Sequence, residues 1–216
     1  MAVALLYCEQ VAISYAWGVN RISAATLGLW TVLALPGAVA LQGFATTPEV
    51  SPGDLLRPTG EWSARLIIIA LMLTPLRHVF PANRAVRWLV RHRRAFGVAA
   101  FAYAVLHLIC YILDMETVAA MLAEIGAPGI WTGWLALLCM VPPALASNDA
   151  AMRRLRENWK RVQRLAYPAA ILTLAHWMLV HDGRASALVQ FAPLLLLQAV
   201  RLGRSINATY TERKII

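Results

Sequence analysis

Six apolar stretches of membrane-spanning length constrain this chain more than any other feature of its sequence. They cover residues 23–44, 62–80, 95–113, 130–146, 165–180 and 187–202. A helix needs about 20 apolar residues to cross the hydrocarbon core of a bilayer, and most of these stretches are close to that length. Of the 216 residues, 60% are hydrophobic and only 14% are charged. The sequence therefore predicts an all-α integral membrane protein, built as a bundle of six transmembrane helices.

The predicted membrane domain covers residues 21–204 and leaves two short terminal segments. Residues 1–20 form an N-terminal extension that is moderately apolar but contains Glu9 and lacks the basic start of a cleaved signal peptide. We expect an interfacial helix there. Residues 205–216 are expected to form a cytoplasmic tail.

Charged residues are segregated between alternate loops. The segment from Arg77 to Arg94, at the junction of the second and third stretches, carries six arginines and no acid, and the loop between the fourth and fifth stretches is also basic. The acids gather in the other loops, as Glu49, Asp54 and Glu61 and then Asp114, Glu116 and Glu124. Because cytoplasmic loops of membrane proteins are rich in Lys and Arg, both termini are predicted to be cytoplasmic (N-in, C-in). The net charge of +9 therefore reflects topology, and no nucleic-acid partner is expected.

Two histidines lie inside membrane-length stretches at matching depths. His107 precedes Asp114 by seven residues and His176 precedes Asp182 by six. Both helices are predicted to run outward, so each imidazole lies about 10 Å below the outer boundary. Ionisable side chains inside a bilayer are costly and mark functional sites, and neutral imidazole is an axial ligand of haem iron. The pair therefore predicts bis-histidine haem ligation, and the alternative is that each ring caps a polar group within the bundle.

Arg65 is a second charge inside a predicted span. It follows Gly60 by five residues, which places it roughly 7–8 Å from the outer boundary. Its guanidinium could bind a haem propionate through paired hydrogen bonds, or it could extend to the outer interface. The tryptophans 62, 131, 134 and 177 are expected to form an aromatic belt near the same boundary.

Other function classes lack their characteristic residues in this sequence. Three cysteines are widely separated, without zinc spacing, and there is no glycine-rich phosphate loop or paired intramembrane carboxylate. No inverted repeat of the kind found in transporters is evident. Electron transfer remains as the function class that the residues favour.

Several short motifs, taken together, resemble the MsrQ/YedZ family of the ferric reductase-like transmembrane superfamily. The first group is Thr59-Gly60-Glu61-Trp62 with Arg65, Leu73-Thr74-Pro75-Leu76-Arg77, Arg93-Arg94-Ala95-Phe96-Gly97 and Tyr103-Ala104-Val105-Leu106-His107. The second group is Ser147-Asn148-Asp149-Ala150, Trp159-Lys160-Arg161, Arg164-Leu165-Ala166-Tyr167 and Ala175-His176-Trp177. The resemblance extends from about residue 57 to about residue 180.

The resemblance implies a membrane subunit with b-type haem in the bacterial inner membrane. Such a subunit passes electrons from quinol or a cytoplasmic flavin reductase to a periplasmic molybdenum enzyme that reduces methionine sulfoxide, and it is not a stand-alone enzyme. His107 and His176 fall on the family's histidine positions, with Arg65 as a further candidate cofactor-binding residue. Quinone or FMN are candidate additional cofactors.

One departure from the family pattern concerns a third histidine. The family's Trp-Lys-Arg-x-His-Arg reads with Gln163 in the histidine position here, and an amide is a poor haem ligand. In this superfamily, histidines about thirteen residues apart on one helix can serve two stacked haems. Gln163 lies thirteen residues before His176 and Arg93 lies fourteen before His107, so both inner positions lack imidazole. We therefore expect one haem per chain, in the outer half of the membrane.

The lost histidine and the N-terminal extension leave a second hypothesis open. A family member could have been recruited as a structural or accessory subunit of a larger membrane complex, with haem retained or lost. A coloured protein with a b-type spectrum would distinguish electron transfer from this structural role.

Overall fold

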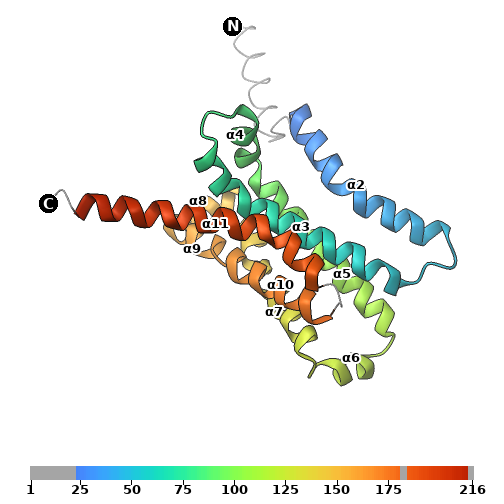
Figure 1. Ribbon diagram of the computed structural model, residues 1–216. Helices are drawn as coiled ribbons and strands as arrows, with labels where there is room; N and C mark the ends of the chain where they lie inside the picture. The colour runs from blue at the N-terminus through green and yellow to red at the C-terminus, as the bar shows by residue number, and fades with distance from the viewer. Residues whose placement is uncertain (1–22, 181–183, 214–216) are drawn as a thin grey trace, which may run out of the picture. The chain divides into compact units, whose positions relative to one another are not determined.

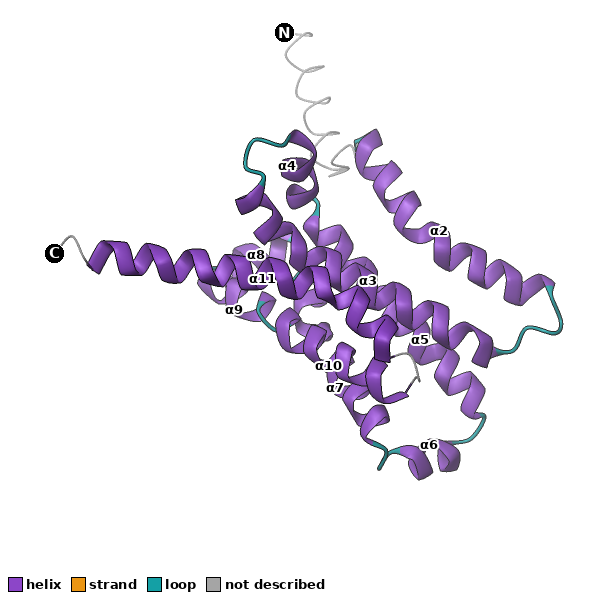
Figure 2. Cartoon of the chain, viewed as in Figure 1, coloured by secondary structure: helices purple, strands orange, loops and turns teal. Residues whose placement is uncertain are grey.

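The computed structural model describes residues 23–180 and 184–213. The described residues divide into two compact units between Leu33 and Ala34, within helix α2 (Ala24–Thr46). The expected interfacial helix at residues 1–20 lies outside the described residues. The described part of the chain is all-α and contains no strand, as Figure 2 shows.

Five of the described helices are long and apolar enough to cross a membrane. They are α2, α3 (Pro52–Val79), α5 (Arg93–Met115), α7 (Pro128–Leu145) and α11 (Arg184–Arg213). The stretch predicted at residues 165–180 forms α10 (Ala166–Val180), which has 15 residues and is shorter than these five. Helix α11 continues past the expected domain boundary at residue 204. The chain is thus a multi-pass membrane protein.

Helix α3 begins ten residues before the predicted stretch at 62–80, and its first turn explains why. Ser51 accepts a hydrogen bond from the Asp54 backbone N–H, and the Asp54 carboxylate accepts one from the Ser51 backbone N–H. This reciprocal capping box satisfies two backbone donors that a helix start leaves open. Pro52 occupies the first helical position, where a missing N–H costs nothing. As a result, Thr59 and Gly60 lie within a helix and not in a loop.

The residues from 34 onward are organised around two antiparallel helix pairs. Helix α3 packs on α5, α7 packs on α10, and α11 contacts both α3 and α10. Figure 1 shows the two pairs, with α3 and α5 in teal and green and α7 and α10 in yellow and orange. Small side chains such as Ala100 and Ala169 are fully buried between the helices, which lets the backbones approach closely. The Ser63 hydroxyl donates to the Ala100 carbonyl across the first pair.

Short helices connect the pairs at their ends. Helices α4 (Arg84–Arg91), α8 (Asp149–Leu155) and α9 (Glu157–Gln163) lie at the basic end, and α6 (Val118–Glu124) lies at the other. Arg94 of α5 donates a 2.6 Å hydrogen bond to the Asp149 carboxylate of α8. This hydrogen bond and the positive charge of Arg94 lower the pKa of Asp149 below its usual value, and Arg153 adds to the effect. The ion pair ties the two helix pairs together at the basic end.

Candidate functional site

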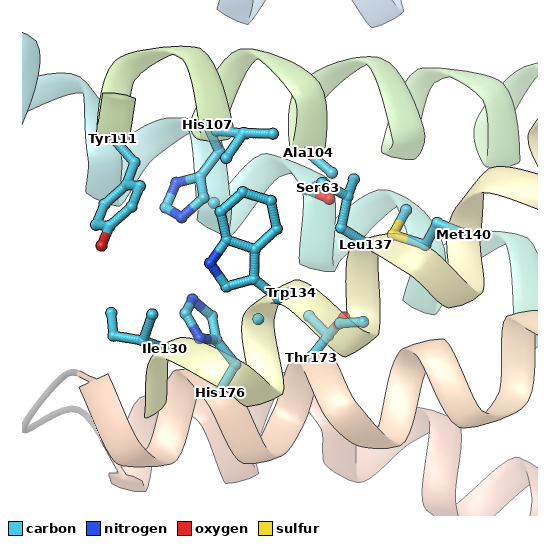
Figure 3. A pocket seen from close by; sticks show the side chains of 14 residues that line it. Ser63, Ala104, His107, Tyr111, Ile130, Trp134, Leu137, Met140, Thr173 and His176 are labelled. Atoms are coloured by element: carbon cyan, nitrogen blue, oxygen red, sulfur yellow. The ribbon is translucent and has the colours of Figure 1, made fainter. Parts of the chain in front are cut away.

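His107 and His176 face each other between the two helix pairs. His107 comes from α5 and His176 from α10, and their ring centroids are 6.1 Å apart with an angle of 83° between the ring planes. Figure 3 shows the two rings projecting toward each other from helices on opposite sides of a cavity. The structure thus brings together the two histidines that the sequence places at one depth.

Each imidazole is oriented by a backbone carbonyl of the neighbouring helix. His107 Nδ1–H donates to the Leu56 carbonyl of α3 at 2.9 Å, and His176 Nδ1–H donates to the Gly129 carbonyl of α7 at 2.7 Å. A carbonyl can only accept, so Nδ1 carries the proton in both rings, and in neutral imidazole the lone pair is then on Nε2. This is the tautomer in which histidine binds a metal through Nε2, with Nδ1 held by an outer partner.

A glycine beside each histidine makes the close approach of the ring possible. A Cβ atom on Gly60 would lie 3.2 Å from His107 Cε1 and Nδ1, and one on Gly133 would lie 2.8 Å from the same atoms of His176. The second distance is shorter than real Cβ contacts, so a side chain at Gly133 would displace the ring. Glycine at these positions leaves room for His107 beside α3 and for His176 beside α7.

The two helix pairs repeat the same local pattern, which the sequence analysis missed. In each pair, a backbone carbonyl accepts a hydrogen bond from the histidine, and a glycine lies four residues after that carbonyl. A threonine comes directly before the glycine. Thr59 donates to the carbonyls of Leu55 and Leu56, and Thr132 donates to those of Pro128 and Gly129. The signal present in the sequence was the dipeptide Thr-Gly near the start of two helices.

The histidines border a cavity of about 110 Å³. The other lining residues are mostly apolar or small: Gly60, Ser63, Ala104, Leu108, Tyr111, Ile130, Gly133, Trp134, Ala136, Leu137, Met140 and Thr173. Trp134, expected in an aromatic belt, borders this cavity in Figure 3, and Trp177 is buried with only 6% of its surface exposed. The belt prediction is therefore wrong for Trp177.

Arg65 lies outside the set of described residues that border the histidine cavity. Its guanidinium pairs with Glu61 one turn earlier on α3 and donates to the Gln190 side chain of α11 at 2.9 Å. It also lies over the Trp62 ring at 5.3 Å. Arg65 is half-buried and bonded within the protein.

A second cavity lies toward the basic end, next to the first. Met140 borders both cavities and is itself buried. The second cavity is lined by Gln163, Arg93 and Gly97, together with Arg94, Trp159, Lys160, Arg164, Tyr167 and Arg201 among its polar and aromatic residues. Gln163 donates to the Pro143 carbonyl at 3.1 Å. The two positions that lack imidazole therefore both line a cavity whose walls are basic.

The family of ferric reductase-like transmembrane components matches residues 59–174 of this chain. That range is more than half of the sequence and includes His107, and it ends two residues before His176. Among curated proteins, the heme-binding subunit MsrQ of protein-methionine-sulfoxide reductase from Xanthomonas campestris pv. campestris strain 8004 is 38% identical over 162 residues, covering 72% of each chain. The chain belongs to the MsrQ/YedZ family.

More distant members of the family agree. The MsrQ subunit of Rhizobium meliloti strain 1021 is 33% identical over 158 residues, covering 69% of this chain and 70% of the relative. The MsrQ subunit of Xanthomonas oryzae pv. oryzae strain MAFF 311018 is 36% identical over 162 residues, covering 72% of each chain. No solved structure matches the chain. The resemblance inferred from short motifs is thereby confirmed.

Proposed function

We propose that the chain binds one b-type haem between His107 and His176 and conducts electrons across the membrane as the subunit of an oxidoreductase system. The observation that carries this proposal is the pair of imidazoles 6.1 Å apart, each held at Nδ1 by a carbonyl. Two imidazoles that face each other at this spacing would hold a haem iron between them, because neutral imidazole is an axial ligand of haem iron.

The donor set also fits haem better than a metal ion bound by protein alone. Among the described side chains, in residues 23–180 and 184–203, no group of three or more His, Cys, Asp or Glu could hold a metal ion. Haem needs only two axial ligands from the protein, because its macrocycle supplies the other four. When bound there, haem would supply one-electron chemistry. The residues of this chain would hold the iron, fix both ring orientations and exclude water with an apolar wall.

For Arg65 we propose contact with a haem propionate. Its present bonds to Glu61 and Gln190 show what such a contact must replace. Arg65 would exchange the neutral Gln190 amide for a carboxylate, which forms a stronger, charge-assisted hydrogen bond with a guanidinium. Weaker haem retention or a shifted redox potential in Arg65→Ala would support this assignment.

We further propose that electrons enter through the basic cavity, from quinol or a flavin. Gln163 and Arg93 replace imidazole there, so this cavity is expected to accept an electron donor and not a second haem. Met140 borders both cavities, so a donor bound in the basic cavity would lie close to the histidine cavity. We keep the six-span, N-in and C-in topology as part of this proposal, with α10 as the sixth, shorter span. The location is then the bacterial inner membrane.

The proposed electron acceptor is a periplasmic oxidoreductase of the methionine sulfoxide reductase type, with a molybdenum cofactor. The relatives are named as heme-binding subunits of protein-methionine-sulfoxide reductase, which supports a partner of this class. We propose docking on the short acidic loops around residues 49–61 and 114–124. Finding the acceptor bound to the basic loops would contradict the proposed direction of electron flow.

Haem stoichiometry and the reduced-minus-oxidised spectrum of the purified protein test the proposed function. We expect one haem per chain and a low-spin, six-coordinate b-type spectrum. A ratio near two would show that another residue supplies an inner ligand and would overturn the single-haem assignment. A colourless protein that co-purifies with a large membrane complex would replace electron transfer by the structural or accessory role.

A further inference from the structure

Four arginines line a separate hollow of about 570 Å³ at the basic end of the protein. Arg77 comes from the last turn of α3, and Arg84, Arg87 and Arg91 come from α4. The three on α4 are spaced by three and four residues, so they share one face of the helix. All four are exposed. This arginine hollow, Arg77-Arg84-Arg87-Arg91, has no part in the proposed haem site.

The opposite face of α4 is apolar and fixes the orientation of the arginines. Val86 is buried, and Leu89 and Val90 are partly buried. Asn83 caps the helix start by accepting a hydrogen bond from the Val86 backbone N–H at 3.1 Å. Packing of the apolar face therefore holds the three α4 guanidinium groups on the side of Arg77.

The hollow concentrates positive charge without an acidic partner among the described residues. The ion pairs among the described residues involve Arg57, Arg65 and Arg94, and none of them includes an arginine of the hollow. Arg87 donates a long hydrogen bond of 3.4 Å to the neutral Pro81 carbonyl. Like charges brought close together repel, so this arrangement is favourable when an anion lies between them. Guanidinium groups bind phosphate through paired hydrogen bonds.

The position of the hollow indicates where the phosphate comes from. Helix α4 connects the ends of two membrane-spanning helices, α3 and α5, so the hollow lies at the membrane interface. Basic pockets at such positions bind the headgroups of anionic lipids. We propose that the arginine hollow binds the phosphate of an anionic phospholipid headgroup. With four guanidinium groups available, a lipid with two phosphates, such as diphosphatidylglycerol, is expected to bind best.

Lipid binding to the full-length protein in neutral detergent tests the proposal. Native mass spectrometry would count bound diphosphatidylglycerol and measure its affinity, with phosphatidylglycerol, phosphatidylcholine and inorganic phosphate as comparison probes. We expect one diphosphatidylglycerol per chain at the hollow, weaker phosphatidylglycerol and no retained phosphatidylcholine. Inorganic phosphate that displaces the lipid at equal concentration would show a soluble anion site and overturn the lipid assignment.

Two paired variants separate a built site from diffuse attraction. Arg84→Gln with Arg91→Gln should weaken binding by about 30-fold, because each basic residue near an anionic lipid contributes roughly fivefold. Arg153→Gln with Arg154→Gln removes the same charge from exposed positions on α8 and should change binding far less. Arg84→Lys with Arg91→Lys keeps the charge and should still weaken binding several-fold, because lysine cannot form paired bonds. Equal losses in the first two variants would overturn the proposal, as would full retention in the lysine variant.

Discussion

The two helix pairs hold their histidines by the same means but with different tightness. In the α3–α5 pair, the carbonyl bond to His107 measures 2.9 Å and a Cβ on Gly60 would approach the ring to 3.2 Å. In the α7–α10 pair, the corresponding values for His176 and Gly133 are 2.7 Å and 2.8 Å. The comparison indicates that two similar half-sites form one site, and that the second half tolerates less change.

The surroundings of the half-sites differ in charge as well. Near His107, α3 carries a chain of ion pairs at four-residue spacing from Arg57 through Glu61 to Arg65. The matching turns of α7 carry the uncharged Trp131 and Trp134. The tighter half-site is thus electrically neutral, and the looser one carries charges that can respond to a bound carboxylate.

The largest effect is expected from removing either histidine. His107→Ala and His176→Ala should each abolish the low-spin, six-coordinate spectrum, because a single axial ligand cannot complete the site. Visible spectra of the purified variants check this result. A normal spectrum in both variants would exclude the pair as haem ligands.

Alanine at the two glycines tests whether the second half-site is the tighter one. Gly133→Ala should lower haem content severely, because its Cβ would have to displace His176, whereas Gly60→Ala should lower it only in part. Gly43→Ala is the control, since a Cβ there meets no atom within 4 Å. Alanine is preferred over glycine in a helix by about 1 kcal/mol, so the control should be neutral or slightly stabilising. Equal loss of haem in Gly60→Ala and Gly133→Ala would show that the difference in packing does not affect haem binding.

Substitutions of Arg65 test whether the charged residues near His107 affect haem binding. Arg65→Ala should weaken haem retention or shift the redox potential, and Arg65→Lys should do less because it keeps the positive charge. Haem content and potentiometric titration measure both effects. Unchanged values in Arg65→Ala would favour a purely structural role through Glu61 and Gln190.

The smallest effect is expected at the ion pair that joins the two helix pairs at the basic end. Arg94 lowers the pKa of Asp149, so the ion pair stabilises the protein at neutral pH and the stabilisation is lost as pH falls through that lowered pKa. Asp149→Asn should therefore lower the melting temperature slightly at pH 7 and not at a pH below that pKa. Because both groups are at the surface, solvent screening keeps the effect small. An equal change in melting temperature at both pH values would show that the effect does not come from the charge of Asp149.

The sequence predicted the helical membrane fold and the two facing histidines, because hydropathy and flanking charge report depth directly. It failed to predict the start of α3, because Asp54, Arg57 and Glu61 make the first turns look like a polar loop. Gly97, which ends one of the motifs shared with the family, has open space beside it, because a Cβ there would meet no atom within 4 Å. The glycines that do matter, Gly60 and Gly133, contact residues more than 40 positions away, and such contacts leave no local pattern.

The groups that orient both histidines belong to the main chain. A substitution at Leu56 changes the side chain and leaves its carbonyl in place, so no single codon change at that position can delete the hydrogen bond to His107. Substitutions in the neighbouring helices can therefore alter the orientation of the rings only indirectly, by filling the space at Gly60 and Gly133. Natural variants of this protein should tolerate many residues at position 56 and almost none at position 133.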